Sequence, residues 1–288
     1  MIIGNNKSKK PIGLVLWEGP SLIDGNPIVV IATSVFGSSE NRKTGDVVQT
    51  YILKKDMPPH FARRLGTDTS ICGDCKHKEA NTCYVNLCHG PIPVFNAYLN
   101  NGYREFVDGV DSVLFKDKIV RFGSYGDPAA VPFEVWEKLS IISKGFMGYT
   151  HQWKTCDQRL KNLCMASVDS IRKENKEFEL AQKMGWRTFR VYGTVDGEKT
   201  QDVLAINEIV CPASKEGGAL VSCAKCRICS GMSKPSAKNI LIMFHGDNEA
   251  VGNWKQRAFV KMMRAIRDKK GWRVKKYVMK KFKQACPF

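Results

Sequence analysis

Two groups of cysteines are the residues of this 288-residue chain whose types and spacing point most directly to chemistry. The first group has the form C-x2-C-x7-C-x4-C and consists of Cys72, Cys75, Cys83 and Cys88. Two thiols on a C-x2-C turn can chelate the same centre, so a loop this short can surround one metal ion or cluster. This group is compatible with zinc and with iron–sulfur chemistry, and its spacing favours neither.

The second group is a Cys-Pro step followed by a C-x2-C-x2-C run, and it consists of Cys211, Cys223, Cys226 and Cys229. These are the elements of a bacterial ferredoxin half-site with the Cys-Pro placed first. Structural zinc sites usually take cysteines in pairs, so this group favours a 4Fe-4S iron–sulfur cluster over zinc. Both groups follow predicted strands. We therefore expect them on the same face of the fold, where they could even share a centre.

Polar side chains follow several other predicted strands, and three of them are candidate catalytic residues. Asp127 could act as a general base or accept a ligand hydroxyl, or it could cap the helix that begins near Pro132. His151 is a candidate proton carrier, with a hydrogen-bonded structural histidine as the alternative. Asp169 is a third candidate for the same pocket, although its place before a helical pattern also predicts a helix cap.

Apolar runs predict the elements that must position these side chains. The predicted strands cover residues 13–17, 27–35, 47–53, 119–122, 146–149, 163–168, 186–192, 208–211 and 240–244, and the predicted helices cover 132–143, 170–183 and a short stretch around 94–98. Strands that alternate with helices predict an α/β fold with a parallel sheet and right-handed crossovers. Six to eight strands in one series favour a partial or complete βα barrel with cysteine-rich loops. The Rossmann fingerprint, the P-loop and the G-x-S-x-G elbow are all missing from the sequence.

The composition is that of a globular protein, with 43% hydrophobic and 25% charged residues. The chain has 45 Lys and Arg against 28 Asp and Glu, a net charge of +17, which suggests an anionic partner such as nucleic acid. Residues 255–288 hold 13 of the basic residues and one acid, Asp268, so a local charge of +12 leaves only +5 for the rest. Most of the excess positive charge therefore belongs to residues 255–288 and not to the rest of the chain.

Two domains are expected: a barrel-like body at residues 1–246, with metal loops at 72–88 and 211–229, and a basic helical tail at 247–288. The tail carries apolar residues at helical spacing and a break at Lys270-Gly271, which predicts two basic amphipathic helices. Its basic face could be a solvated surface of a docked helix pair, a contact surface for nucleic-acid phosphates, or a contact with an anionic membrane. The candidate nucleic-acid-binding residues are Lys255, Arg257, Lys261, Arg264, Arg267, Lys269, Lys270, Arg273, Lys275, Lys276, Lys280, Lys281 and Lys283.

Several short strings resemble an uncharacterised cysteine-rich family of bacteriophage proteins over roughly residues 40 to 246. The strings are Lys43-Thr44-Gly45-Asp46, Val48-Gln49-Thr50, Cys83-Tyr84-Val85-Asn86, Tyr125-Gly126-Asp127-Pro128 and Cys211-Pro212-Ala213-Ser214. That family is more distantly similar to radical S-adenosylmethionine enzymes, which use partial βα barrels. The resemblance implies a cluster in the loop that follows the first barrel strand, here the loop from Cys72 to Cys88. It also implies a cofactor side lined by Ser124, Tyr125, Gly126 and Asp127.

One departure from the radical enzymes concerns their C-x3-C-x2-C triad, which this sequence lacks. A cluster held by four cysteines would also leave no open iron, so both observations argue against binding of S-adenosylmethionine. The principal hypothesis is a radical-enzyme-like iron–sulfur barrel protein that acts on or binds nucleic acid. The alternative is a non-enzymatic nucleic-acid-binding protein stabilised by zinc.

The compartment follows from what the sequence lacks. No run of about 18 uncharged apolar residues predicts a membrane span, and the polar first ten residues do not form a secretory signal. We expect a reducing cytoplasm, that of the host cell if a phage encodes the protein, where cysteines serve as metal ligands more often than as disulfides.

Overall fold

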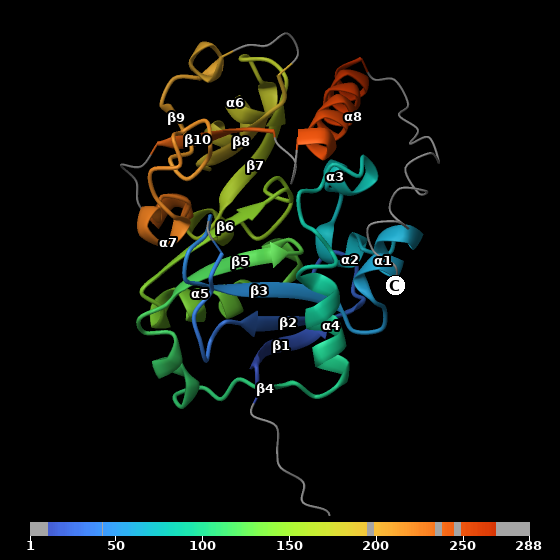
Figure 1. Cartoon of the computed structure of the whole chain (residues 1–288), viewed down its shortest axis with the longest axis vertical. Coiled ribbons are helices and arrows are strands. Elements are labelled where there is room, and N and C mark those ends of the chain that lie inside the picture. Colours follow the sequence, from blue (N-terminus) through green and yellow to red (C-terminus); the bar gives the residue numbers. More distant parts are fainter. Residues whose placement is uncertain (1–10, 42, 195–198, 234–237, 245–248, 269–288) are drawn as a thin grey trace, which may run out of the picture.

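The computed structural model describes residues 11–41, 43–194, 199–233, 238–244 and 249–268. Its strands are β1 (Gly13–Pro20), β2 (Pro27–Thr33), β3 (Val47–Lys54), β4 (Tyr103–Glu105), β5 (Ile119–Tyr125), β6 (Gly145–Thr150), β7 (Met165–Ser170), β8 (Thr188–Tyr192), β9 (Glu208–Val210) and β10 (Asn239–Met243). Its α-helices are α1 (Pro59–Leu65), α2 (Thr69–Cys72), α3 (Lys76–Glu79), α4 (Pro91–Leu99), α5 (Phe133–Ile142), α6 (Lys176–Lys183), α7 (Cys223–Cys226) and α8 (Glu249–Arg267). These elements confirm the predicted α/β class (Figure 1).

All ten strands form one sheet in the order β4-β1-β2-β3-β5-β6-β7-β8-β10-β9. The β1–β2 and β2–β3 pairs are antiparallel, and every other neighbouring pair is parallel. Within the described residues the sheet is open, with β4 and β9 at its two edges, so the expectation of a complete barrel is wrong. The physical reason is the hairpin of β1 and β2, because it continues the sheet beyond β3 and occupies the edge that a closed barrel would pair with its last strand.

From β3 to β8, the strands of the parallel series lie side by side in chain order, and β10 then lies between β8 and the edge strand β9. Crossovers of one hand then place the connecting helices on one face of the sheet. Helix α5 packs there through Trp136 and Leu139, and α6 packs through Phe178 and Ala181, all of which are buried. The apolar strands are buried on both faces, as in β10, where every residue is buried.

Helix α6 begins later than predicted, and the expected cap by Asp169 is wrong. Asp169 and Ser170 still belong to β7, where Ser170 pairs with Tyr192 of β8. Asn175 caps the helix instead, since its side-chain oxygen accepts hydrogen bonds from the backbone N–H groups of Glu177 and Phe178. Asp169 is therefore not a helix cap, and its carboxylate can contact other side chains near the carboxyl end of β7.

Helix α8 lies in the first part of the predicted tail, and its Phe259 and Met262 are buried against the body. The second predicted segment lies outside the described residues. Figure 1 shows α8 beside α3, on the side of the molecule where β5 ends. Among the described helices, none is long and apolar enough to cross a membrane.

Candidate metal centres

The two cysteine groups lie at opposite ends of the parallel strands. In the first group, the carbonyl of Cys72 accepts a hydrogen bond from Gln152, which follows the carboxyl end of β6. In the second group, the backbone N–H of Cys223 donates to the carbonyl of Lys43, which precedes the amino end of β3. Figure 1 accordingly shows α7 and the α1–α3 segment on opposite sides of the sheet. The expectation that both groups share one face is therefore wrong, because the chain after β9 turns back toward the amino ends of the strands.

The second group converges from two places in the sequence onto one apolar cluster. Cys211 and Cys229 are buried there with Val47, Ile119 and other residues at or near the amino ends of the strands, and Cys223 packs against the same cluster. A negative charge on Cys226 would raise the pKa of each of the other three thiols, so all four lie within electrostatic range of one another. The structure thus brings together the four residues that the spacing singled out.

Positive side chains surround this second group. Burial raises the pKa of Cys223, and Arg121 and Lys43 oppose that rise. Burial raises the pKa of Cys229 to about 12, although Tyr149 donates a hydrogen bond to its sulfur. Arg187 also lies within range of Cys229. Among the described residues, no acidic side chain is a main influence on Cys211, Cys223 or Cys229. The nearby cations therefore favour the thiolate form of these cysteines, whereas burial favours the neutral thiol.

The described cysteine sulfurs do not form a group of three at the spacing that a single tetrahedral ion requires. Zinc binds thiolates at about 2.3 Å, which places tetrahedral sulfurs about 3.8 Å apart. Within the described part of the chain, no three cysteine sulfurs lie within 4.8 Å of one another, and one histidine–aspartate group alone meets that criterion.

The first group contains three free thiols, those of Cys72, Cys75 and Cys83, whereas Cys88 is disulfide-bonded. Burial raises the pKa of Cys72 well above its usual value, and Cys75 and Cys83 are among the neighbours that raise it further. Arg63 is the nearby cation, and it is paired with Asp68. Three of the four predicted ligands therefore lie together at the carboxyl ends of the strands.

Asp127 is a structural residue of this end of the sheet. One carboxylate oxygen accepts a hydrogen bond from the N–H of Ala129, at 3.0 Å, and the other accepts from the N–H of His151, at 2.8 Å. Burial raises the pKa of Asp127. Both oxygens thus bind backbone N–H groups: Asp127 caps the short 3₁₀ helix η2 (Pro128–Ala130) and holds the start of the loop that carries His151. The expected cap of the helix near Pro132 is wrong, because α5 begins after Pro132 without a side-chain cap.

His151 and Asp169 lie beside His77, which the sequence did not single out as a catalytic or ligand residue. His77 Nε2 is 2.9 Å from Asp169 Oδ1, and its ring lies edge-on to that of His151 with centroids 5.6 Å apart. Burial would lower the pKa of His77, but the Asp169 carboxylate outweighs burial and raises it. No direct signal in the sequence points to this residue, because His77 and Asp169 are 92 positions apart.

The predicted cofactor-side residues lie at the end of β5. Ser124 donates a hydrogen bond to Gln49, and Tyr125 is buried with its hydroxyl unpartnered among the described groups. Gly126 has a φ of +83°, and a Cβ there would lie 2.6 Å from a side-chain atom of Ile52. Gly126 is therefore required by the turn and by the close approach of β3.

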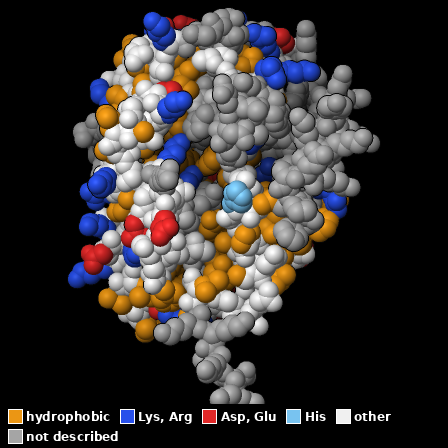
Figure 2. Space-filling model, viewed as in Figure 1, with side chains coloured by type: hydrophobic (Ala, Val, Ile, Leu, Met, Phe, Trp, Pro, Cys, Tyr) orange, Lys and Arg blue, Asp and Glu red, His pale blue; other side chains and the backbone are white. Residues whose placement is uncertain are grey.

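Four of the candidate nucleic-acid residues have described side chains. Arg257, Lys261 and Arg264 are exposed on α8, while Lys255 is half-buried and donates a hydrogen bond to the carbonyl of Cys83. The side chain of Arg267 and the other basic residues of the tail lie outside the described part. On the face drawn in Figure 2, Lys and Arg side chains occupy much of the left and upper margin.

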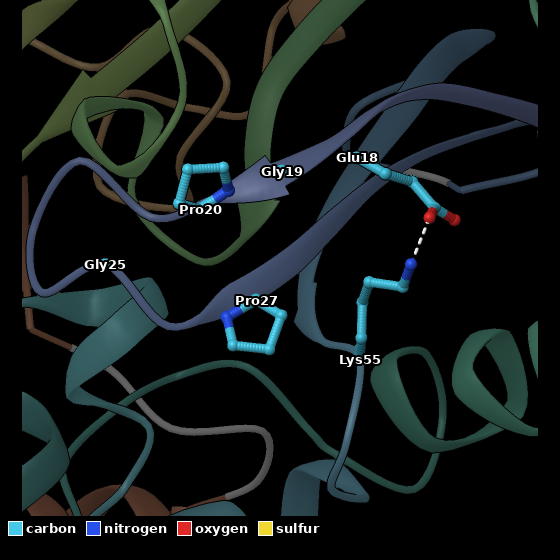
Figure 3. A pocket seen from close by; sticks show the side chains of 6 residues that line it. All are labelled: Glu18, Gly19, Pro20, Gly25, Pro27 and Lys55. Atoms are coloured by element: carbon cyan, nitrogen blue, oxygen red, sulfur yellow. Dashed lines mark hydrogen bonds and ion pairs between the residues drawn. The ribbon is translucent and has the colours of Figure 1, made fainter.

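An open hollow of about 450 Å³ lies at the β1–β2 hairpin and is lined by Glu18, Gly19, Pro20, Gly25, Pro27 and Lys55. Its charged groups, Glu18 and Lys55, pair with each other (Figure 3). The hollow therefore offers a ligand little uncompensated charge, and it lies apart from both cysteine groups.

Comparison with known proteins gives no relative from which a function could be transferred. No protein-family model matches the chain, and no match is found among the curated proteins or the solved structures. The resemblance to bacteriophage proteins and radical enzymes stays a prediction.

Proposed function

We propose that the protein is an iron–sulfur protein built on an open, radical-enzyme-like βα barrel, with a 4Fe-4S cluster bound by Cys211, Cys223, Cys226 and Cys229. The observation that carries this proposal is the convergence of these four thiols, two buried and two half-buried, beside the cations Lys43 and Arg121. Four thiolates around a cluster leave a net negative charge, and the nearby Lys43 stabilises it. The raised pKa values mean that binding iron must displace the thiol protons.

The spacing of the sulfurs is compatible with a cluster. Each thiolate of a 4Fe-4S cluster binds a different iron, so the sulfurs stand further apart than around one ion. The described cysteines are not gathered at the spacing of a single zinc ion, which matches this requirement.

The first group is proposed to hold a second cluster at the reactive end of the sheet. The parallel series begins at β3, and Cys72, Cys75 and Cys83 follow that strand, as the resemblance implies. Barrel enzymes build their sites at the carboxyl ends of the strands. Three thiolates would leave one iron open to a cofactor or substrate.

We also propose that α8 contacts nucleic acid. The observation that favours this second function is the division of the helix into two faces. Phe259 and Met262 are buried, whereas Arg257, Lys261 and Arg264 are exposed. A row of exposed cations on a docked helix is suited to phosphate contacts that carry no sequence information.

Anaerobic purification of the full chain tests the iron–sulfur proposal. We expect a brown protein with about eight iron and about eight sulfide per chain, as two 4Fe-4S clusters require. Because the groups lie at opposite ends of the sheet, Cys72→Ser and Cys223→Ser should each remove about half of both. Iron, sulfide and zinc analysis measures this directly.

Cys156→Ser is the matched control, since Cys156 is also a half-buried free cysteine but belongs to neither group. It should keep the full iron and sulfide content. A colourless protein with stoichiometric zinc and no sulfide would contradict the proposal and favour the zinc-stabilised alternative. Complete loss in either single variant would contradict two clusters that are bound independently.

A further inference from the structure

We propose that His77, His151 and Asp169 form a mononuclear site for a divalent first-row transition-metal ion, with no thiol among its ligands although Cys75 lies within electrostatic range of His77 and Asp169. This inference goes beyond the proposed iron–sulfur function and does not rest on it. The three residues come from α3, from the residue after β6, and from β7, so they meet at the carboxyl edge of the sheet. Ligands on separate, packed elements are held in place before an ion binds.

The distances suit such an ion. One ligand atom from each residue lies within 4.8 Å of the other two. His77 Nε2 and Asp169 Oδ1 are 2.9 Å apart. Metal–ligand bonds of about 2.0–2.2 Å place neighbouring ligands about 3.0–3.4 Å apart, depending on the coordination geometry. The first pair therefore already has a suitable spacing, and a ligand atom of His151 lies within 4.8 Å of both partners.

The hydrogen bonds orient His77 for metal binding. Its Nδ1 lies 2.9 Å from Thr82 Oγ1, and donation of that proton to threonine leaves Nε2 with a lone pair directed at Asp169 and His151. Metal-bound histidines commonly use their second nitrogen in this way. Asp169 is itself held, because its carbonyl accepts a hydrogen bond from Asn175.

A second, independent observation is the buried Nε2 of His151, which has no hydrogen-bond partner among the described groups. A buried polar atom without a hydrogen-bond partner costs folding free energy, and a bound ligand at this position would remove that cost. A structural ion pair of His77 with Asp169 would not explain this atom, because both partners of that pair are already satisfied without His151. A metal ion would satisfy all three residues at once.

The surroundings shield one side of the site. Phe244 and Phe259 stack nearly parallel to the His77 ring, at 6.2 and 5.5 Å between centroids. Two imidazoles and one carboxylate are a ligand set found with zinc and with non-haem iron(II), and this set leaves coordination positions open. Those open positions would allow the ion to bind water or a substrate oxygen.

Cobalt(II) added anaerobically to the purified full chain is the probe for this site. Equilibrium dialysis with elemental analysis should show one bound Co²⁺ per chain that depends on the three residues. His151→Ala and Asp169→Asn should each weaken its binding at least about tenfold. Asp169→Asn keeps the side-chain volume and an oxygen that can accept from His77, so it tests the ligand set even if His151→Ala fails to fold.

His60→Ala is the matched control, since His60 is also half-buried and has a buried ring nitrogen without a partner. It should bind Co²⁺ like the unaltered chain, and iron and sulfide contents should be equal in all variants. The proposal is overturned if the histidine and aspartate variants take up Co²⁺ as tightly as the unaltered chain. It is also overturned if the Co²⁺ spectrum shows thiolate coordination alone. A chain without sulfide but with this Co²⁺ pattern would refute the iron–sulfur function and leave the present site standing.

Discussion

At the residue scale, Arg190 of β8 and Glu208 of β9 form an ion pair inside the sheet. Both side chains are fully buried, and the guanidinium also donates to the carbonyls of Val203 and Arg172. Glu208 in turn accepts a hydrogen bond from the N–H of Ala205. The pair therefore joins β8 to the short edge strand β9 and to the loop between them.

We predict that Glu208→Gln lowers the free energy of unfolding by about 3–5 kcal/mol, because the change leaves a charged guanidinium buried without a carboxylate. Urea denaturation of the full chain at neutral pH measures the loss.

The matched control for this prediction is Glu134→Gln, which breaks an ion pair with Arg159 at the surface, where both side chains are more than half exposed. That change should cost at most about 1 kcal/mol. Equal losses in the two variants would show that burial does not set the cost of breaking the pair.

At the element scale, one aspartate holds the turn between β4 and the short 3₁₀ helix η1 (Asp111–Leu114). Both oxygens of Asp111 accept hydrogen bonds from Arg104 at 2.6 Å, and one also accepts from the N–H of Val107 at 2.8 Å. The hydrogen bonds from Arg104 lower the pKa of Asp111 below its usual 3.8. The folded state therefore binds this proton more weakly than the unfolded chain does.

A lowered pKa makes the stabilisation depend on pH in a defined direction. The contribution of Asp111 is present in full above the unfolded value near 3.8 and is lost as the pH falls through the lower folded value. We predict that Asp111→Asn lowers the free energy of unfolding at pH 7 and flattens its decline below about pH 4. Thermal unfolding from pH 7 to pH 3 measures both effects, and a decline as steep as in the unaltered chain would contradict the assignment.

At the scale of the whole molecule, the net charge of +17 is concentrated in the tail, whose described helix α8 covers the carboxyl end of the sheet. Phe259 packs there against Phe244 and His77, so a polyanion held by α8 would lie close to the candidate metal residues. Binding through the exposed cations should release counterions from the polyanion.

We predict that the full chain binds short single- or double-stranded nucleic acid and that affinity falls steeply between about 50 and 200 mM salt. Replacing Arg257, Lys261 and Arg264 by alanine should reduce the slope of log affinity against log salt by about 2 to 3. Fluorescence anisotropy across salt concentrations measures both slopes.

The control removes the same charge elsewhere, by replacing the exposed Lys116, Lys173 and Lys183 with alanine. Its slope should match that of the unaltered chain. Equal slopes in the two triple variants would mean that net charge, rather than the surface of α8, governs binding.

The sequence by itself determined most of the strands and the two crossover helices, because apolar runs and the 3.6-residue period are local properties of the chain. It also identified the two cysteine groups, since ligand spacing on a short loop is local as well. Helices α1 to α3 were not predicted because they are short. Helix α2 ends at the first cysteine of the loop at residues 72–88, and α3 lies within that loop, whose pattern is set by ligand spacing.

Only the tertiary structure decided where these pieces meet. The sheet is open rather than closed into a barrel, because the β1–β2 hairpin pairs with the edge of β3 that closure would require. The two cysteine groups lie at opposite ends of the strands, because the chain after β9 folds back toward the amino ends of the strands. The tertiary structure also brings His77 to Asp169 and His151, since contacts between residues far apart in sequence depend on strand order and on the packing of loops over the sheet.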